Sequence, residues 1–226
     1  MARVVAVGVP HHITQRGNQR RDVFLNDELR QVYLDLLAEH SEKNGLPIQA
    51  YCIMTNHLHM VAIPERERSL ASTFRNAHGR FAQFWNTAAR RVGHMWQNRF
   101  YSCPVEPQGA WRVIRYVELN PVRAGMVRAA SEYRWSSARA HTRLGEPRML
   151  DMSGWTWTAA EWAALLAEAS ESDCETIRHA THTGRPWGSE EFIQQLEQEL
   201  DRNLAVRKGG RPKKVAPDYS GQGSLW

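Results

Sequence analysis

The chain has 226 residues, of which 42% are hydrophobic, 23% charged and 9% aromatic, which suits one domain with an appendage. No apolar run approaches the ~18 residues of a membrane span, and the short apolar start does not fit a signal peptide. The three cysteines, Cys52, Cys103 and Cys174, lack CxxC spacing, which argues against a disulfide framework or a thiolate zinc cluster and favours the cytoplasm. These features exclude membrane, secreted and fibrous proteins. The 29 Lys and Arg against 24 Asp and Glu, a net charge of +5, favour an anionic partner.

Apolar residues recur with two different periods along residues 4–145, so both strands and helices are expected. Asn26 or Asp27 can cap a helix that ends near Gly45, and Pro121 is expected to stop a later one. The order of elements predicts an α+β fold with an antiparallel sheet. The predicted elements are a strand within residues 4–15, a helix from 26 to 44, strands at 48–54 and 57–63 joined by a tight turn, a helix from 69 to 85, a strand ending near 105 and a helix from 108 to 119.

The sequence changes character after residue 145. A Gly-Glu-Pro linker precedes three tryptophans at the start of an alanine-rich helix, and residues 192–204 predict a further short helix. We therefore expect a first domain at residues 1–145, a helical extension at 146–205 and a flexible basic tail at 206–226. Cations set among glycine and proline can bind DNA nonspecifically or enter a narrow minor groove. In the tail, these candidates are Arg207, Lys208, Arg211, Lys213 and Lys214.

His57 and His59 lie two residues apart in a predicted strand. Side chains alternate faces along a strand, so both imidazoles point the same way, roughly 7 Å apart at the backbone. Two such imidazoles can converge on a first-row divalent ion such as Mn²⁺, but a solvated or hydrogen-bonded pair is the alternative that spacing alone favours. At most one of His11 and His12 can share their face. His179 and His182 have no carboxylate or thiolate beside them, which predicts surface positions.

Tyr116 and Asn120 are four residues apart and therefore share one face of a predicted helix. The pattern alone favours a structural role, with Tyr116 at the edge of the core and Asn120 capping the end of the helix. Arginines and aromatic residues scattered along the first 125 residues could neutralise phosphates and stack unpaired bases, or could form a solvated cationic surface around ordinary core aromatics. The residues concerned are Arg16, Arg20, Arg21, Arg75, Arg80, Arg90, Arg91, Trp96, Arg99 and Arg123.

Three blocks of sequence, in matching order, resemble the single-tyrosine HUH transposases, and most closely their REP-associated tyrosine transposase branch. The blocks are residues 12–18 (HITQRGN), 50–59 (AYCIMTNHLH) and 116–125 (YVELNPVRAG), so the resemblance covers roughly residues 8–140. Residues 183–188 (TGRPWG) and the Gly-Arg-Pro-Lys run of the tail also resemble the C-terminal extension of that branch.

The resemblance implies a ferredoxin-like, RRM-resembling antiparallel sheet with helices on one face. The site would lie on the other face, covered by the helix that carries the tyrosine. It further implies that His57 and His59 are ligands of Mg²⁺ or Mn²⁺ and that Tyr116 is the nucleophile. Related transposases carry a polar third ligand one helical turn after the tyrosine, for which Gln is the better-known choice. Here that position holds Asn120, one methylene shorter.

The activity implied by the resemblance is metal-dependent cleavage and rejoining of single-stranded DNA at hairpin-forming palindromes through a 5′-phosphotyrosine intermediate. Arg16, Arg99 and Arg123 are then candidates for phosphate contacts, and Trp96 for base stacking. Two alternatives remain, a non-catalytic binder of single-stranded DNA or RNA and a metal phosphodiesterase with a water nucleophile. The sequence leaves open whether the protein is a monomer or a homodimer, and whether it moves a mobile element or serves its host.

Overall fold

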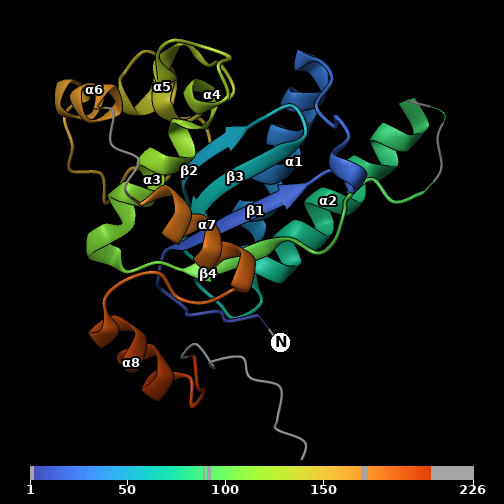
Figure 1. Ribbon diagram of the computed structural model, residues 1–226. Coiled ribbons are helices and arrows are strands. Elements are labelled where there is room, and N and C mark those ends of the chain that lie inside the picture. Colours follow the sequence, from blue (N-terminus) through green and yellow to red (C-terminus); the bar gives the residue numbers. More distant parts are fainter. Residues whose placement is uncertain (1–2, 89, 91–92, 169–172, 205–226) are drawn as a thin grey trace, which may run out of the picture.

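The computed structural model describes residues 3–88, 90, 93–168 and 173–204 (Figure 1). Within them, four strands form one antiparallel sheet in the order β2-β3-β1-β4. Together with the succession β1-α1-β2-β3-α2-β4, this order confirms the predicted ferredoxin-like α+β fold. The elements are β1 (His11–Arg16), η1 (Asn18–Arg20), α1 (Asp27–Asn44), β2 (Ile48–Ile53), β3 (His57–Ala62), α2 (Ser69–Ala88), β4 (Tyr101–Pro104), η2 (Pro107–Gly109), α3 (Ala110–Glu118), α4 (Asn120–Arg123), η3 (Ala130–Glu132), α5 (Ala138–His141), α6 (Ala159–Ala167), α7 (Cys174–Thr183) and α8 (Glu190–Glu199).

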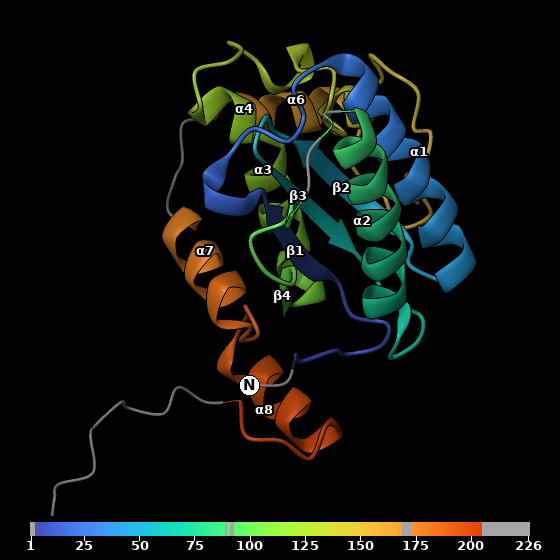
Figure 2. The same cartoon turned by 90° about the vertical axis from the view of Figure 1, so that its right-hand side faces the viewer.

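The two faces of the sheet carry different helices. Helices α1 and α2 pack against each other on one face, whereas α3 lies against β2 and β3 on the other (Figures 1 and 2). Helix α7 lies beside α3 on that second face, against β4 and β1. In the described part of the chain, no helix combines the length and the apolar character that crossing a bilayer requires.

Strand β1 lies at the end of the range in which the sequence predicts it. It begins at His11, because Gly8 has a φ of 76° and Pro10 has no N–H for a ladder hydrogen bond. The residues before it serve another purpose, since Val4 and Ala6 are buried against α8. The helix predicted over residues 26–44 is confirmed as α1, whose N-cap side chain, Asn26, accepts a hydrogen bond from the backbone of the first turn.

The helix predicted over residues 108–119 ends before Pro121, as the sequence predicts, but a second short helix follows almost at once. Helix α3 ends at Glu118, one residue of non-regular structure follows, and Pro121 lies in the first turn of the short helix α4. Proline is tolerated there because the first N–H groups of a helix have no intrahelical acceptor to lose. The break places Asn120 at the start of α4 rather than at the end of the tyrosine helix.

The core beneath α1 and α2 contains an aromatic cluster that includes Trp96. Its ring lies 4.6 Å from that of His78 and 6.2 Å from that of Phe81, and its indole N–H donates to the backbone oxygen of His78. Trp96 therefore packs, partly buried, on the side of the sheet that α1 and α2 cover. This position argues against base stacking by Trp96, which stays a prediction.

The C-terminal segments pack onto the same fold. Trp162 of α6 is fully buried, and Trp162 and Ile177 of α7 belong to the hydrophobic core that contains the sheet residues. Helix α8, predicted over residues 192–204, forms a smaller cluster with the N-terminal segment through Phe192 and Leu196. The division of the chain into domains at residue 145 stays a prediction.

A buried carboxylate joins α3 to α5 and α6. Glu118 is 0% exposed, and its oxygens accept hydrogen bonds from the hydroxyl of Ser137 and the indole N–H of Trp162, the latter at 2.7 Å. Nδ1 of His141 lies 2.6 Å from the carboxylate, and the His141 ring stacks on Trp155 at 3.8 Å. These contacts fix the end of α3 and thereby the helix that carries Tyr116.

Candidate active site

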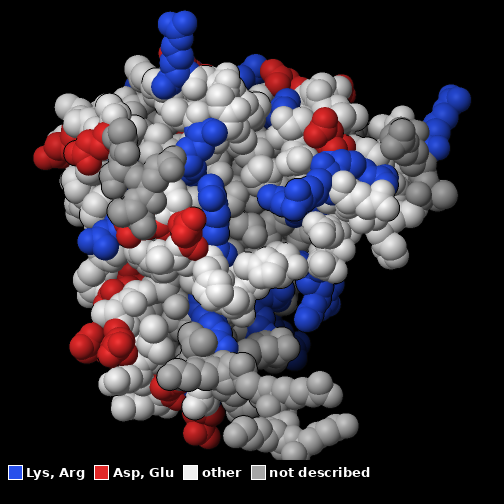
Figure 3. Space-filling view, viewed as in Figure 1, with Lys and Arg blue, Asp and Glu red and all other residues white. Residues whose placement is uncertain are grey.

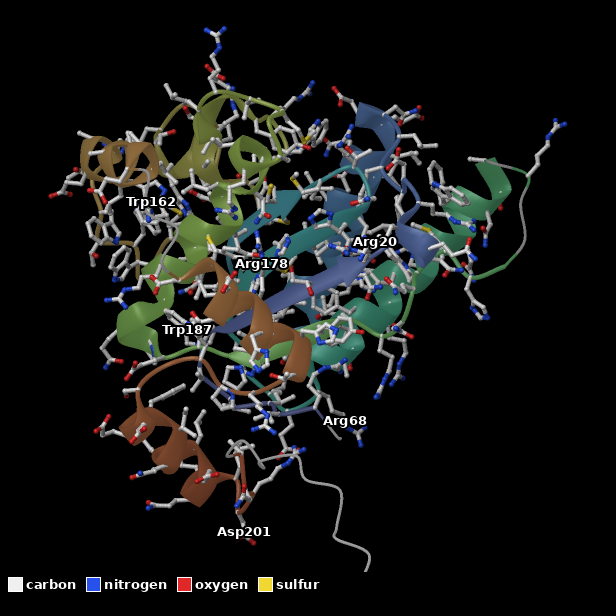
Figure 4. All side chains as sticks on the ribbon, viewed as in Figure 1. Arg20, Arg68, Trp162, Arg178, Trp187 and Asp201 are labelled. Carbon is white, nitrogen blue, oxygen red and sulfur yellow. The ribbon has the colours of Figure 1, made fainter. Side chains whose placement is uncertain are left out.

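A cavity of about 570 Å³ opens on the second face of the sheet, between α3, α4 and α7. Four arginines and no Asp or Glu are among the described residues that line it. Two of these arginines, Arg20 of η1 and Arg178 of α7, are labelled in Figure 4. In Figure 3, Lys and Arg side chains gather around the middle of this face, while Asp and Glu lie mostly towards its edges. The lining residues are His12, Thr14, Gln15, Arg16, Arg20, Met54, His57, His59, Gln97, Tyr101, Tyr116, Asn120, Arg123, Ala124, Arg178, Thr181 and His182.

The structure brings His57 and His59 together on β3. Their ring centroids are 5.1 Å apart, and the pairing of β3 with β1 places them opposite Arg16 and Thr14 respectively. Leu58 and Met60, on the alternate positions, are buried in the core. The alternation of a half-buried strand thus places both imidazoles in the cavity, as their spacing indicates.

Both imidazoles are held in the neutral form. Burial, with a smaller contribution from the positive charge of Arg16, lowers the pKa of His57 to about 4. Burial lowers the pKa of His59 well below its usual value, and the neighbouring His57 and His12 lower it further. An imidazole must be neutral to bind a metal, so these groups are competent ligands at neutral pH.

Each histidine has one ring nitrogen in a hydrogen bond within the protein. Nδ1 of His57 lies 2.6 Å from the side-chain oxygen of Asn56, and Nδ1 of His59 lies 3.1 Å from Nε2 of His12. Such bonds fix ring orientation in metal sites and leave the other nitrogen to bind the ion. Of His11 and His12, the sequence predicts that at most one shares the face of His57 and His59. His12 does so and lies next to His59.

Tyr116 reaches the same cavity from α3. Its ring centroid lies 5.6 Å from that of His59 and 5.5 Å from that of His12. The guanidinium of Arg123 lies 4.5 Å from its ring centroid, and Nε of Arg178 donates a hydrogen bond of 3.3 Å to its hydroxyl. The structure therefore brings the tyrosine and the two histidines, some sixty residues apart in sequence, around one cavity.

Asn120 also lines this cavity, but its amide nitrogen caps α3. Nδ2 donates to the backbone oxygens of Tyr116 at 3.0 Å and Val117 at 3.1 Å, as in the structural alternative drawn from the sequence. The side-chain oxygen is then the atom that could bind a metal. The described residues hold no cluster of three or more His, Cys, Asp or Glu suited to a metal. The candidate ligand set implied by the resemblance is two imidazoles and one amide.

This set fits a divalent ion that receives further ligands from a substrate. The candidate ligands are the two neutral imidazoles of His57 and His59 and the amide oxygen of Asn120, and the described lining supplies no carboxylate. Hard ions such as Mg²⁺ and Mn²⁺ prefer oxygen ligands. The remaining ligands and the balancing negative charge would therefore come from phosphate oxygens.

The other sequence-predicted contacts are distributed unevenly. Arg16 and Arg123 line the site cavity, whereas Arg99 lines a neighbouring cavity of about 430 Å³ together with Arg3. Trp96 is partly buried against the core. The five basic candidates of the tail, Arg207, Lys208, Arg211, Lys213 and Lys214, lie outside the described residues.

Several residues at this site could not be predicted from local sequence patterns. Arg178 and Thr181 come from α7, and no local pattern connects that helix with β1 or α3. His182 lies on the surface as predicted, yet it also lines the cavity and stacks on Tyr101 with ring centroids 5.1 Å apart. Only the pairing of β1 with β3 could have indicated the role of His12 beside His59.

The fold and this site define a candidate enzyme that acts on phosphate groups. Comparison with protein families identifies its kind. Residues 7–120, half of the chain, match the family model described as "Transposase IS200 like". The chain belongs to the IS200-like transposases and is an enzyme of DNA transposition that cleaves DNA; transposases of this family are generally metal-dependent.

Two solved structures are similar to this chain. A REP-associated tyrosine transposase bound to a REP hairpin shares 20% identity and has a TM-score of 0.54, covering 70% of this chain and 92% of that one. A putative transposase from Deinococcus radiodurans R1 shares 18% identity with a TM-score of 0.38, covering 52% of this chain and 95% of that one. The first likeness shows that the fold is shared. No curated protein sequence matches the chain.

Proposed function

We propose that this transposase cleaves and rejoins single-stranded DNA at hairpin-forming palindromes, with Tyr116 as the nucleophile. One observation carries the proposal. The Tyr116 ring lies 5.6 Å from that of His59 in a cavity lined by four arginines and, among the described residues, by no carboxylate. A site of this charge suits a phosphodiester.

In the proposed reaction, the phenolic oxygen of Tyr116 attacks the scissile phosphorus. A P–O bond to tyrosine forms, the bond from phosphorus to the 3′ oxygen breaks, the phenolic proton is lost and the 3′ oxygen gains a proton. The products are a 5′-phosphotyrosine and a free 3′-OH. Because the phosphotyrosine keeps the energy of the original ester, attack by a 3′-OH can rejoin strands and release the tyrosine without ATP.

A Mg²⁺ or Mn²⁺ ion held by His57, His59 and the side-chain oxygen of Asn120 would polarise a phosphate oxygen and stabilise the leaving 3′ oxygen. The other contributions come from side chains of the protein. Arg16 and Arg123 neutralise the DNA phosphates, and the hydrogen bonds at Nδ1 of the two histidines hold their rings in place. Tyr116 and the two histidines of the same chain meet around one cavity, which supports an active site formed within a single protomer.

The proposed substrate is an unpaired strand, because a duplex keeps its bases stacked and holds its backbone in a regular helical geometry. Support for a hairpin comes from the similar transposase, whose structure contains a REP hairpin. The exposed Tyr101, which lines the cavity, replaces Trp96 as the residue proposed to stack on a base.

The test uses labelled hairpin oligonucleotides with unpaired flanks, Mg²⁺ or Mn²⁺, and a denaturing gel. We expect a covalent protein–DNA band that requires the metal, is lost in Tyr116→Phe and persists in Tyr51→Phe, a buried tyrosine outside the cavity lining. Hairpin binding by Tyr116→Phe should survive. Cleavage without a covalent band would instead support a water nucleophile, and binding without cleavage would support a non-catalytic binder.

A further inference from the structure

Helix α7 lies outside the part of the chain that matches the family model, yet it contacts the centre of the candidate site. Building on the function proposed above, we propose that α7 completes the active site. In this proposal Arg178 is a catalytic residue at the nucleophilic oxygen, and Thr181 is a positioning residue that orients His59 through His12.

The structure anchors α7 firmly on the sheet. Ile177, Ala180 and Thr181 are buried on its inner side, against β4 and β1. After Gly184 ends the helix in the left-handed region, the next segment pairs with the strand continuing from β4. The backbone N–H of Trp187 donates to the oxygen of Pro104 at 2.8 Å. Figures 1 and 2 both show α7 beside α3, across the second face of the sheet.

A chain of hydrogen bonds runs from α7 to a metal-ligand candidate. The Thr181 hydroxyl donates to the backbone oxygen of Ile177 at 2.8 Å, and the same oxygen lies 2.6 Å from Nδ1 of His12. Having given its only proton to the backbone, the hydroxyl can accept at this contact, so Nδ1 of His12 is the protonated nitrogen. Nε2 of His12 then carries a lone pair and accepts the Nδ1 proton of His59.

The consequence is that Nε2 of His59 carries the lone pair that a metal ligand needs. The opposite polarity would put a proton on that nitrogen and block coordination. His12, His59 and Thr181 are all buried, and the His12 and His59 rings are stacked with an interplanar angle of 9°. Water therefore competes little for these bonds, and Thr181 sets the direction of the whole chain.

Arg178 acts at the other side of the cavity. Its Nε donates to the Tyr116 hydroxyl at 3.3 Å, and its guanidinium carbon lies 5.9 Å from the ring centroid. A guanidinium stays charged at any pH at which the protein is folded. It would therefore stabilise the negative charge that develops on the phenolic oxygen as its proton leaves, and afterwards the phosphate ester on that oxygen.

The first test replaces Arg178, which is exposed and should not be needed for folding. We expect Arg178→Ala to form the covalent DNA adduct about 100-fold more slowly. Its rate should also reach its plateau at a higher pH than in the wild type, with Arg178→Lys intermediate. The matched control is Arg75→Ala, an exposed arginine on α2, on the far face of the sheet. Equal rates and pH profiles for Arg178→Ala and Arg75→Ala would overturn the catalytic role.

The second test measures metal binding in the absence of DNA. Co²⁺ is the probe because it binds imidazole more tightly than Mn²⁺ does. By titration calorimetry, Thr181→Val should bind Co²⁺ roughly 10- to 100-fold more weakly, and Thr181→Ser, which restores the hydroxyl, should recover the wild-type affinity. Unchanged affinity in folded Thr181→Val would overturn the positioning role. If Thr181→Val does not fold, the test rests on Thr181→Ser. A folded serine variant that binds Co²⁺ more weakly than the wild type would also overturn the positioning role of Thr181.

The outcomes separate this inference from the proposed function. If wild-type protein forms no adduct, or Tyr116→Phe still forms one, the proposed function fails whatever the α7 variants do. If the adduct depends on Tyr116 while the Arg178 and Thr181 variants behave like wild type, only the role of α7 fails.

Discussion

Helix α3 carries two buried polar side chains, Tyr116 and Glu118, that are two residues apart and so point to nearly opposite sides of the helix. Each lies in a cluster that contains at least one buried histidine. Tyr116 faces His12 and His59 at the wall of a cavity that four arginines line. Glu118 is 0% exposed and faces His141, with its partners drawn from Ser137 and Trp162.

The two clusters differ in what their polar groups face: those around Glu118 face one another, and those around Tyr116 face a cavity. Around Glu118, donors from α5 and α6 converge on one carboxylate, and His141 is stacked on a tryptophan ring. Around Tyr116, nitrogen atoms and a hydroxyl border a space that can hold a phosphate. Residue type alone therefore does not separate the two kinds of histidine; we propose a functional role for His59 because of the adjoining cavity and its charge.

The largest expected effect separates the clusters by replacing one histidine in each. His59→Ala should reduce adduct formation more than about 100-fold because it removes a proposed metal ligand. His141→Ala should instead cost roughly 3 kcal/mol of unfolding free energy, because the carboxylate loses a donor and the core gains a cavity. For a chain of this size, that loss lowers Tm by roughly 6–12 °C.

Adduct assays at 20 °C and thermal denaturation of both variants check the comparison. Activity assays are run well below the Tm of each variant, so that unfolding does not imitate a catalytic defect. Loss of activity in folded His141→Ala as large as that in His59→Ala would mean that the Glu118 cluster takes part in the reaction.

The parts that sequence reasoning predicted are those with a local period. The two-residue alternation at His57 and His59, and the four-residue step from Tyr116 to Asn120, are properties of single elements. The ferredoxin-like sheet, by contrast, followed from the resemblance to known transposases. The two local patterns depend on only a few neighbouring residues, so they could be read from the sequence. All four of their residues line the cavity.

The parts that failed depend on contacts between distant segments. His12 and Thr181 are separated by 169 positions, and no periodicity within β1 or α7 indicates that they meet. Trp96 looked like a base-stacking residue because it stands among Arg, Gln and Asn in the sequence. The neighbours that decide its position are the rings of His78 and Phe81 on α2.

A smaller effect concerns pH and the buried histidines away from the site. Burial lowers the pKa of His78 to about 3 and that of His11 to about 4, against about 6.5 in an unfolded chain. Above pH 6.5 both states are neutral. As pH falls from 6.5 towards 4, only the unfolded state gains these protons, so stability is lost at up to ~1.4 kcal/mol per pH unit for each group.

His78→Phe should therefore flatten the acid side of the stability curve by about one proton, measured by urea denaturation between pH 4 and 7.5. In the wild type, the Tyr33 hydroxyl lies 3.0 Å from Nε2 of His78. The substitution removes this partner, so stability at pH 7.5 should fall by about 1 kcal/mol. The adduct rate at pH 7.5 should stay within about twofold, because His78 lies on α2, across the sheet from the cavity. An unchanged acid slope would mean that His78 titrates alike in both states.

The smallest expected effect tests the third ligand, where a structural and a functional role meet in one side chain. Asn120→Asp keeps an oxygen for the metal and adds a negative charge, so it should bind Mn²⁺ more tightly. It also replaces the amide donor to the backbone oxygens of Tyr116 and Val117 by an acceptor, which should cost about 1 kcal/mol of stability. Asn120→Ala should lose the same cap and gain no affinity. If the aspartate and alanine variants bind Mn²⁺ equally, Asn120 only caps α3, and the ion has two protein ligands here. The two variants thus separate the role that Asn120 shares with Glu118, holding α3, from the role that it shares with His59.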